Sequence, residues 1–506
     1  MIRVNAAAEL PDWVAWRAAA TPQRVALEAR GRRWTFSELD ADVTRTARRL
    51  AHVGVRTGDR VATLLQNGPE AVLLAHAVPR LGATLVPLNV RLGDAEIAWQ
   101  AGDVRARLLV AESRTAGAAG AAGAARPELT LVSVDADGAA RLGGASLGSI
   151  DEADVELLAA HAADDVHTII YTSGTTGRPK GAMLTFGNHW WSAIGSALNL
   201  GVHASDRWLA VLPLFHVGGL SILLRSAIYG ITAVVHEAFD EAAVNRAIDD
   251  DAITIVSVVA ATLTRMLDAR RDRPYPATFR CALLGGGPAP RPLLERCAEA
   301  GIPVVQTYGL TETASQVATL APGDAPSRPG SAGRPLYPNE LRIGDADASG
   351  AGEILVRGPV VMAGYADRPA ESARALVDGW LHTGDVGRLE DGYLYVLDRR
   401  DDLIVSGGEN VYPAEVEGAL LAHASVLEAG VVGAPDPRWG ARVVAVVRLS
   451  NAAPVTTDQL LAHCRTLLGG FKLPSEIRFT SEPLPRTASG KLRRRALRAS
   501  LGDDSP

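Results

Sequence analysis

The stretch Val166–Gly181 reads VHTIIYTSGTTGRPKG and decides how the rest of the chain is interpreted. Its first part, Val166–Ile170, is apolar and rich in β-branched residues, which is typical of a buried strand. The part that follows places hydroxyls, glycines and Lys180 in one short loop. Glycine N–H groups, hydroxyls and a lysine suit an anion, and α/β folds bind ligands where strands end. The stretch therefore predicts a strand followed by a polyphosphate-binding loop, although a Ser/Thr/Gly cluster taken alone is as often an ordinary connection. Its spacing differs from the GxxxxGK[ST] pattern of P-loop NTPases.

Strand-like and helix-like segments alternate over most of the chain. The helical pattern of Phe36–Val53 and the short apolar runs after it predict βαβ units with parallel strands. The same rhythm returns in strand-like runs at Val61–Leu65, Ala83–Leu88, Trp208–Leu212, Ile253–Val259, Cys281–Leu284 and Pro303–Gln306. The Ala- and Gly-rich stretch Thr115–Ala125 predicts a surface connection or a variable loop. These patterns indicate a large α/β domain.

The C-terminal part follows five consecutive charged residues, 398–402, which in most proteins are simply a solvated turn. After this run, the pattern predicts a strand at Leu403–Val405 and a helix that opens at Pro413. Strands near 426–432 and 443–449 and a helix from Thr457 complete a small α+β module. The predicted organisation is an α/β large N-terminal domain, residues 1–397, and a small α+β C-terminal domain, residues 398–506.

Composition and charge limit the possible functions. A chain of 506 residues with 47% hydrophobic and 21% charged residues is typical of a multidomain globular protein, and its net charge of -6 gives no support for nucleic-acid binding. Cys281, Cys297 and Cys464 are widely spaced, which favours reduced thiols. The N-terminal residues lack a signal-peptide pattern, and no apolar stretch is long enough to span a bilayer. We expect a soluble, cytoplasmic enzyme without nucleic-acid or membrane partners.

Four segments, in order, resemble motifs of the adenylate-forming enzymes, which comprise acyl-CoA synthetases, adenylation domains and luciferases. The loop at 171–181 is similar to the phosphate loop of that family, and Tyr308–Glu312 (YGLTE) resembles its second nucleotide motif. Trp380–Asp385 (WLHTGD) resembles its ribose motif, and Pro485–Lys491 (PRTASGK) resembles the segment with its catalytic lysine. The resemblance implies the adenylate-forming fold, in which the small domain rotates against the large one at a hinge that aligns with Asp401.

The resemblance also implies an AMP-forming acid–thiol ligase that uses ATP, Mg²⁺ and coenzyme A. A carboxylate would attack the α-phosphate of ATP, giving an acyl-adenylate and pyrophosphate, and the CoA thiol would then displace AMP. Both steps gather negative charge around phosphorus or a carbonyl oxygen, so cations and hydrogen-bond donors must already be in place.

Site residues follow from their positions in the motifs. Thr311 would bond the α-phosphate, Glu312 would ligate Mg²⁺, and Lys491 would bridge the carboxylate and the α-phosphate during adenylation. Read alone, a Thr-Glu pair is as well explained by a helix start. The implied nucleotide- and CoA-binding residues are Thr172, Ser173, Gly174, Thr175, Thr176, Gly177, Lys180, Gly285, Gly286, Gly287, Thr307, Tyr308, Gly309, Asp385, Arg399, Gly407 and Gly408.

The acyl pocket is expected around Leu212–Leu220 (LPLFHVGGL), where the family places an aromatic or histidine gate, here His216. With neighbouring segments, this stretch most resembles the family's ligases for 2-succinylbenzoate, an acid with two carboxylates that belongs to menaquinone biosynthesis. Arg225 is then the predicted partner of the carboxylate that does not react. Residues expected to line the same cavity are Thr307, Ser315 and Gln316.

Other interpretations of the same residues stay open at this point. Arg225 could be an ordinary salt-bridged arginine, and His216 a packed neutral histidine. A CoA ligase for another aryl or medium-chain acid is the main alternative, and a non-catalytic nucleotide-binding relative is a remote one. Members of the family are often homodimers, so a homodimer is also an expectation.

Overall fold

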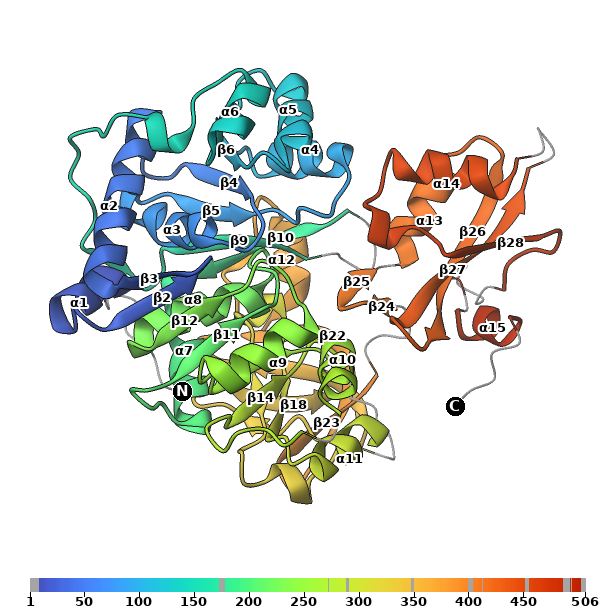
Figure 1. Cartoon of the computed structure of the whole chain (residues 1–506). Helices are drawn as coiled ribbons and strands as arrows, with labels where there is room; N and C mark the ends of the chain where they lie inside the picture. The colour runs from blue at the N-terminus through green and yellow to red at the C-terminus, as the bar shows by residue number, and fades with distance from the viewer. Residues whose placement is uncertain are drawn as a thin grey trace.

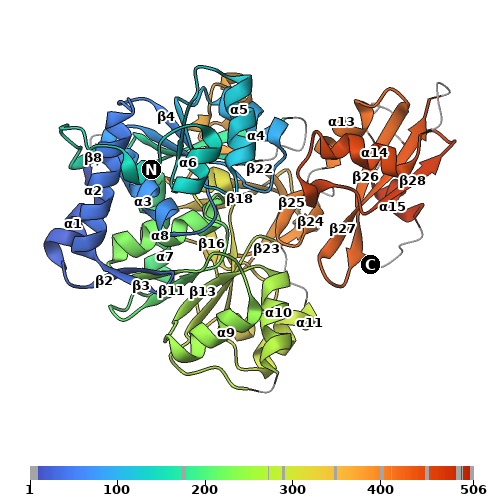
Figure 2. The same cartoon turned by 45° about the horizontal axis from the view of Figure 1, so that its top comes forward.

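The computed structural model describes residues 9–172, 178–271, 273–287, 291–346, 350–398, 404–411, 413–450, 455–485, 492 and 494–501. Figure 1 shows a large body that contains the chain as far as β23 (Tyr393–Asp398) and a small body, in orange and red, from β24 (Ile404–Ser406) onward. The turned view in Figure 2 keeps the small body beside the large one. Among the described residues, the core of the small body consists of side chains from residue 404 onward. The exact domain boundary, between residues 397 and 398, stays a prediction.

A mostly parallel sheet forms one half of the large body. Among the described residues its strand order is β20-β10-β9-β5-β4-β6-β7, and β9, β5, β4, β6 and β7 pair in parallel. The strands are β20 (Gly364–Tyr365), β10 (Lys180–Thr185), β9 (Val166–Thr172), β5 (Thr84–Pro87), β4 (Arg60–Leu64), β6 (Leu108–Ala111) and β7 (Thr130–Ser133). The parallel pairing confirms the βαβ units, and β9 confirms the strand predicted ahead of the glycine-rich loop.

A second sheet forms the other half, in the order β17-β16-β15-β14-β13-β11-β12-β2-β3. Its strands are β17 (Arg334–Pro335), β16 (Ala318–Thr319), β15 (Val304–Tyr308), β14 (Cys281–Leu284), β13 (Ile255–Val258), β11 (Arg207–Ala210), β12 (Thr232–Val235), β2 (Val25–Ala29) and β3 (Arg32–Thr35). Its parallel centre, β15-β14-β13-β11-β12, contains the four strand-like runs predicted after residue 206.

Smaller antiparallel sheets complete the large body. One joins β1 (Glu9–Pro11) to β8 (Ala160–Ala162). The other consists of β18 (Glu340–Gly344), β19 (Gly352–Arg357), β22 (Trp380–Glu390), β21 (Leu376–Val377) and β23.

Helices cover the sheets and fill the space between them. Those of the large body are α1 (Trp13–Ala20), α2 (Phe36–His52), α3 (Pro69–Ala77), α4 (Asp94–Asp103), α5 (Ala116–Ala125), α6 (Ala136–Leu142), α7 (Phe186–Leu200), α8 (Val217–Tyr229), α9 (Glu241–Asp250), α10 (Ala260–Arg270), α11 (Arg291–Glu299) and α12 (Pro369–Ala375). The largest core cluster combines side chains of both large sheets with side chains of α7 and α8. Helix α8 is buried along almost its whole length, so polar side chains on it are largely shielded from bulk water.

The prediction of a loop at Thr115–Ala125 is wrong, because this stretch forms helix α5. Alanine has the highest helix propensity of the common residues, and it outweighs the glycines here. Ala116, Ala119 and Ala122 lie on one face at a spacing of three and are buried. Packing of this small-residue face explains why a low-complexity stretch is ordered.

The small body has the predicted α+β arrangement. Among the described residues its sheet has the order β25-β24-β27-β26, with β28 paired to β27. Its elements are β24, β25 (Glu409–Val411), α13 (Pro413–Leu421), β26 (Val426–Asp436), β27 (Gly440–Leu449), α14 (Thr457–Arg465), β28 (Glu476–Thr480) and α15 (Arg494–Ala499). Thr456 caps α14 with its hydroxyl, which explains why the helix starts at Thr457.

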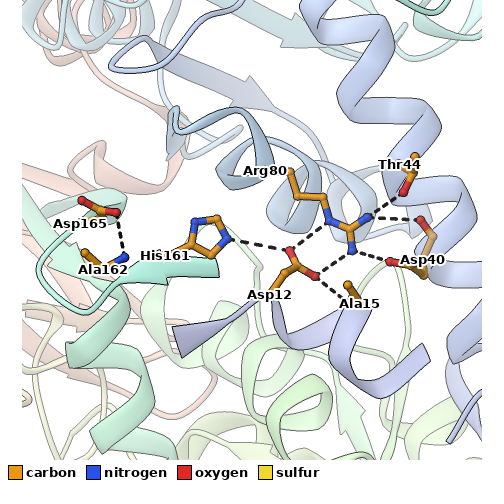
Figure 3. Close-up of polar contacts among 8 residues, drawn as sticks. All are labelled: Asp12, Ala15, Asp40, Thr44, Arg80, His161, Ala162 and Asp165. Carbon is orange, nitrogen blue, oxygen red and sulfur yellow. Dashed lines mark hydrogen bonds and ion pairs between the residues drawn. The ribbon is translucent and has the colours of Figure 1, made fainter. Parts of the chain in front are cut away.

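A buried ion-pair network ties the start of the chain to the large body (Figure 3). Asp12, the N-cap of α1, lies 2.8 Å from the Arg80 guanidinium and 4.0 Å from His161 of β8. Arg80 also pairs with Asp40 of α2. Burial would raise the pKa of Asp12, but its contacts with His161 and Arg80 bring that pKa well below its ordinary value.

Candidate functional site

A cavity of about 740 Å³ opens where the central strands of the second sheet end. Its wall includes Val259 after β13, Gly285 and Gly286 after β14, and Gly309 after β15. The carboxyl ends of parallel strands are where open α/β sheets hold ligands, because backbone N–H groups and loop side chains converge there. The cavity is therefore the candidate site.

Most of the sequence-predicted site residues that the structure describes line this cavity. They are Thr172, Lys180, His216, Arg225, Gly285, Gly286, Thr307, Gly309, Thr311, Glu312, Ser315, Gln316, Asp385 and Gly408. Tyr308 lies behind the wall, Gly407 lines a neighbouring cavity, and Gly287 lines neither. The predicted residues Ser173, Gly174, Thr175, Thr176, Gly177, Arg399, Asp401 and Lys491 lie outside the described part of the chain. The structure thus gathers the described residues of the first three motifs around one cavity, while the role of each residue stays a prediction.

The segment after β15 forms a tight turn that presents Glu312 to the cavity. Glu312 accepts a hydrogen bond of 2.9 Å from the Tyr365 hydroxyl, and the Lys180 ammonium lies 5.0 Å from the centre of the Tyr365 ring. A Cβ on Gly309 would lie 1.5 Å from the Ser315 carbonyl oxygen, so only glycine fits this turn. The turn and strand β10 together place a carboxylate and a cation in the same cavity, as a metal–phosphate complex requires.

Asp385 of β22 is held by a residue of another motif. Its carboxylate accepts a 2.8 Å hydrogen bond from the Tyr308 hydroxyl, and its side chain is buried against the cavity wall. Tyr308 thereby orients Asp385, which explains why the tyrosine belongs to the site without lining it.

Arg225 lies on α8 with its side chain buried against the cavity. The residue is 2% exposed, and its Nη2 donates to the Ser192 hydroxyl of α7 at 2.9 Å. Its Nε is buried without a hydrogen-bond partner, and no carboxylate among the described residues pairs with it. Burial lowers the pKa of Arg225. A buried cation without a counter-charge is costly, so Arg225 marks a place for an anion.

The small body closes one side of the cavity with the strand-turn around Gly408 and Glu409. The Glu409 carboxylate lies 3.1 Å from His216 Nε2 and also pairs with Arg91 of the large body. Burial would raise the pKa of Glu409, but the hydrogen bond with His216 and the charge of Arg91 lower it. His216, the N-cap residue of α8, therefore touches the small body directly.

A second inter-domain contact is centred on Lys472. Its ammonium lies 2.7 Å from Glu96 of α4 and 2.6 Å from Glu415 of α13. All three side chains are buried or nearly so, with exposed fractions of 4%, 13% and 11%. Burial, together with the neighbouring Glu96, raises the pKa of Glu415 to about 7, although Lys472 opposes the shift.

A neighbouring cavity of about 560 Å³ lies between the two bodies. It shares Gly408, Glu409, Val259 and Phe471 with the first cavity, and it also reaches Trp439 of the small body. The two spaces therefore meet next to Gly408.

Several residues of the site lie outside the sequence motifs. Ser257 and Val258 could have been found, because they end a predicted central strand. Tyr365, Arg374 of α12 and Phe471 also line the cavity, but no local pattern marks them.

Within the described ranges, every helix is too short or too polar to cross a bilayer.

Comparison with protein families agrees with this geometry. The model of the AMP-binding enzyme family matches residues 14–366, and that of the AMP-binding enzyme C-terminal domain matches residues 415–491. The 2-succinylbenzoate--CoA ligase of Geobacillus kaustophilus is 50% identical over 494 residues, which cover 97% of each chain.

Among solved structures, the chain is similar to o-succinylbenzoate CoA synthetase from Bacillus subtilis. A double mutant of that enzyme bound with its product analogue OSB-NCoA has 42% identity and a TM-score of 0.89, with 99% of each chain covered. The enzyme in complex with the acyl-adenylate intermediate OSB-AMP has the same identity and coverage but a TM-score of 0.72.

Proposed function

The chain belongs to the AMP-binding enzyme family, and from this premise we propose that it joins 2-succinylbenzoate to CoA with the conversion of ATP to AMP and pyrophosphate. It is an AMP-forming acid–thiol ligase, with ATP, Mg²⁺ and CoA as the other reactants. The full-length match to ligases for this acid supports the choice of substrate.

One observation within the molecule carries this assignment: Arg225 lines the cavity and has no carboxylate partner among the residues that the structure describes. A monocarboxylate needs its only carboxylate free to react with ATP, so it offers nothing to a buried guanidinium. A dicarboxylate can place its second carboxylate against Arg225 while the first one reacts, and a bidentate carboxylate is the ligand that a guanidinium binds best. The cavity therefore has the groups for the reaction and, at Arg225, a place for a second negative charge.

In the first step, one carboxylate oxygen of the acid forms a bond to the α-phosphorus of ATP, and the bond from that phosphorus to the pyrophosphate oxygen breaks. Thr311 would donate to the α-phosphate, and Lys180 would stand near the departing phosphates. Glu312 fits a hard cation, since its carboxylate faces the cavity. Mg²⁺, when bound there, would neutralise phosphate charge. Lys491 would act in the same step, and the hinge would lie at Asp401.

The second step fits the domain arrangement described here. The TM-score is higher for the complex with the product analogue than for the complex with the acyl-adenylate, although identity and coverage are equal. This supports an arrangement that suits attack of the CoA thiol on the acyl carbonyl, with AMP leaving. CoA would enter through the 560 Å³ cavity and pass Gly407 and Gly408.

Location and assembly are part of the proposal. A cytoplasmic location is supported by Cys281, Cys297 and Cys464, which are free and buried thiols. A homodimer is proposed from the family resemblance, and light scattering of the purified protein tests it.

The test of function is pyrophosphate release with ATP, Mg²⁺ and CoA over four acids: 2-succinylbenzoate, benzoate, 4-chlorobenzoate and octanoate. We expect a preference of at least about tenfold in kcat/KM for 2-succinylbenzoate, since one charged hydrogen bond contributes roughly 1.5–3 kcal/mol. Turnover mainly of a monocarboxylate would leave the reaction type intact and refute the substrate.

The Arg225→Ala variant tests whether Arg225 binds the second carboxylate. We expect KM for 2-succinylbenzoate to rise by at least about tenfold, with KM for benzoate nearly unchanged, because only the dicarboxylate loses its counter-charge. A uniform rise for both acids would argue against direct recognition by Arg225.

A further inference from the structure

The hydroxyl of Ser192 on α7 lies between Arg225 and the turn that carries Glu312. Ser192 is 2% exposed and its Oγ makes two hydrogen bonds. It accepts from Arg225 Nη2 at 2.9 Å and donates to the Ala314 carbonyl oxygen at 2.7 Å. A hydroxyl has a single proton, so donation to Ala314 leaves only lone pairs to face the guanidinium.

Ser192 holds one nitrogen of Arg225, and the guanidinium carbon also lies 5.8 Å from the centre of the Trp208 ring. Ser192 is the one hydrogen-bond partner recorded for this guanidinium among the described residues, and Nε is left without any. A free arginine side chain has several rotamers of similar energy, and burial alone does not select one. With Nη2 held by Ser192, the guanidinium has fewer orientations at the point where Arg225 lines the cavity.

The other bond of Ser192 reaches the turn that carries Glu312. Ala314 and Ser315 have positive φ angles of 49° and 96°, so this turn holds a backbone conformation that side chains disfavour. The Ala314 carbonyl is thereby tied, through one hydroxyl, to the arginine of the acyl pocket.

We propose that Ser192 is a positioning residue that determines specificity: it orients Arg225 toward the second carboxylate of a dicarboxylic acid and fixes it relative to the nucleotide turn at Ala314. The inference rests on the proposed function. It assigns to Ser192 no contact with the substrate, and it predicts that loss of the hydroxyl affects dicarboxylates alone.

The test compares Ser192→Ala with wild type, using 2-succinylbenzoate and benzoate at saturating ATP and CoA. We expect KM for 2-succinylbenzoate to rise roughly tenfold, because a hydrogen bond to a charged group is lost, while kcat and KM for benzoate stay within about twofold. Ser192→Thr keeps a hydroxyl and should retain a KM for 2-succinylbenzoate close to that of wild type.

Ser226→Ala is the matched control. Ser226 follows Arg225 on α8, is equally buried, and has a hydroxyl without a hydrogen-bond partner among the described residues. It should leave both KM values unchanged, and thermal unfolding of each variant reports on the fold.

The outcomes separate the two proposals. An equal rise of both KM values in Ser192→Ala, or no rise at all, overturns the positioning role. If Arg225→Ala loses discrimination between the acids while Ser192→Ala keeps it, the positioning role alone is refuted. If wild type itself shows no preference for the dicarboxylate, the proposed substrate fails first.

Discussion

Replacing Lys472 by methionine should impair thioester formation much more than adenylation. Lys472 is the buried cation between Glu96 on the large body and Glu415 on the small body. Methionine fills a similar volume but leaves two neighbouring carboxylates without a positive charge. Removing one partner of a buried ion pair costs about 3–5 kcal/mol.

Only part of that free energy concerns the contact between the bodies. The bond to Glu415 lies within the small body and persists in any domain orientation, whereas the bond to Glu96 requires the present one. Assigning about half of the loss to Glu96 gives about 1.5–2.5 kcal/mol. Because each 1.4 kcal/mol changes an equilibrium tenfold, the population of this arrangement should fall roughly 10- to 60-fold.

The assay separates the two half-reactions. Pyrophosphate release without CoA measures adenylation, and single-turnover conversion of purified acyl-adenylate upon addition of CoA measures thioester formation. We expect the second rate to fall at least about tenfold in Lys472→Met and the first to stay within about threefold. The control is Arg478→Met, which removes a cation whose partner Glu476 lies on the same small body and is partly exposed.

A second variant checks the charge argument. Adding Glu96→Gln to Lys472→Met removes one of the two unpaired carboxylates, so the double variant should recover part of the thioester rate. The reasoning is refuted if Lys472→Met slows both half-reactions equally, or if the added Glu96→Gln lowers the rate further.

The pH dependence of the same contact has a definite sign. Burial and the neighbouring Glu96 raise the pKa of Glu415 from its ordinary 4.5 to about 7, and because Glu96 lies on the large body, the packed arrangement binds a proton more tightly than a separated one. The contact is therefore most stable below pH 4.5 and weakens as the pH rises toward about 7. In Glu415→Gln, the thioester rate should lose an inflection near pH 7, and an unchanged pH profile would contradict this role.

Three further predictions concern other parts of the molecule. Asp12→Asn should destabilise the fold by about 3–5 kcal/mol in urea unfolding, because Arg80 would lose a buried partner; this stabilisation should be present near neutral pH and diminish in acid, since the pKa of Asp12 is lowered. An unchanged midpoint would exclude it. Gly309→Ala should slow adenylation by about 100-fold or more, since its Cβ would lie 1.5 Å from the Ser315 carbonyl oxygen and displace the turn; a near-normal rate would contradict the turn geometry. Lys491→Ala should block pyrophosphate release but spare thioester formation from supplied acyl-adenylate, and equal loss of both would refute the assigned role.

Local sequence patterns determined much of this protein. The apolar run Val166–Ile170 is a strand because β-branched residues and burial favour one, and the helix from Thr457 starts where Thr456 can cap it. The glycine-rich loop and the turn at Thr311 could be predicted to bind ligand because each follows a strand of an α/β domain, whereas Asp385 lies within β22. Local composition misled at Ala116–Ala125, where packing of an alanine face makes a helix out of a low-complexity stretch.

Contacts between residues far apart in the chain were decided only by the tertiary structure. Lys472 and Glu96 are separated by 376 positions, and Ser192 meets Arg225 only because α7 packs on α8. Neither pairing leaves a periodic signal in the sequence. The free energy of such contacts comes from burial and the exclusion of water, which exist only after the elements have packed, so the chain encodes the partners without revealing which of them will meet.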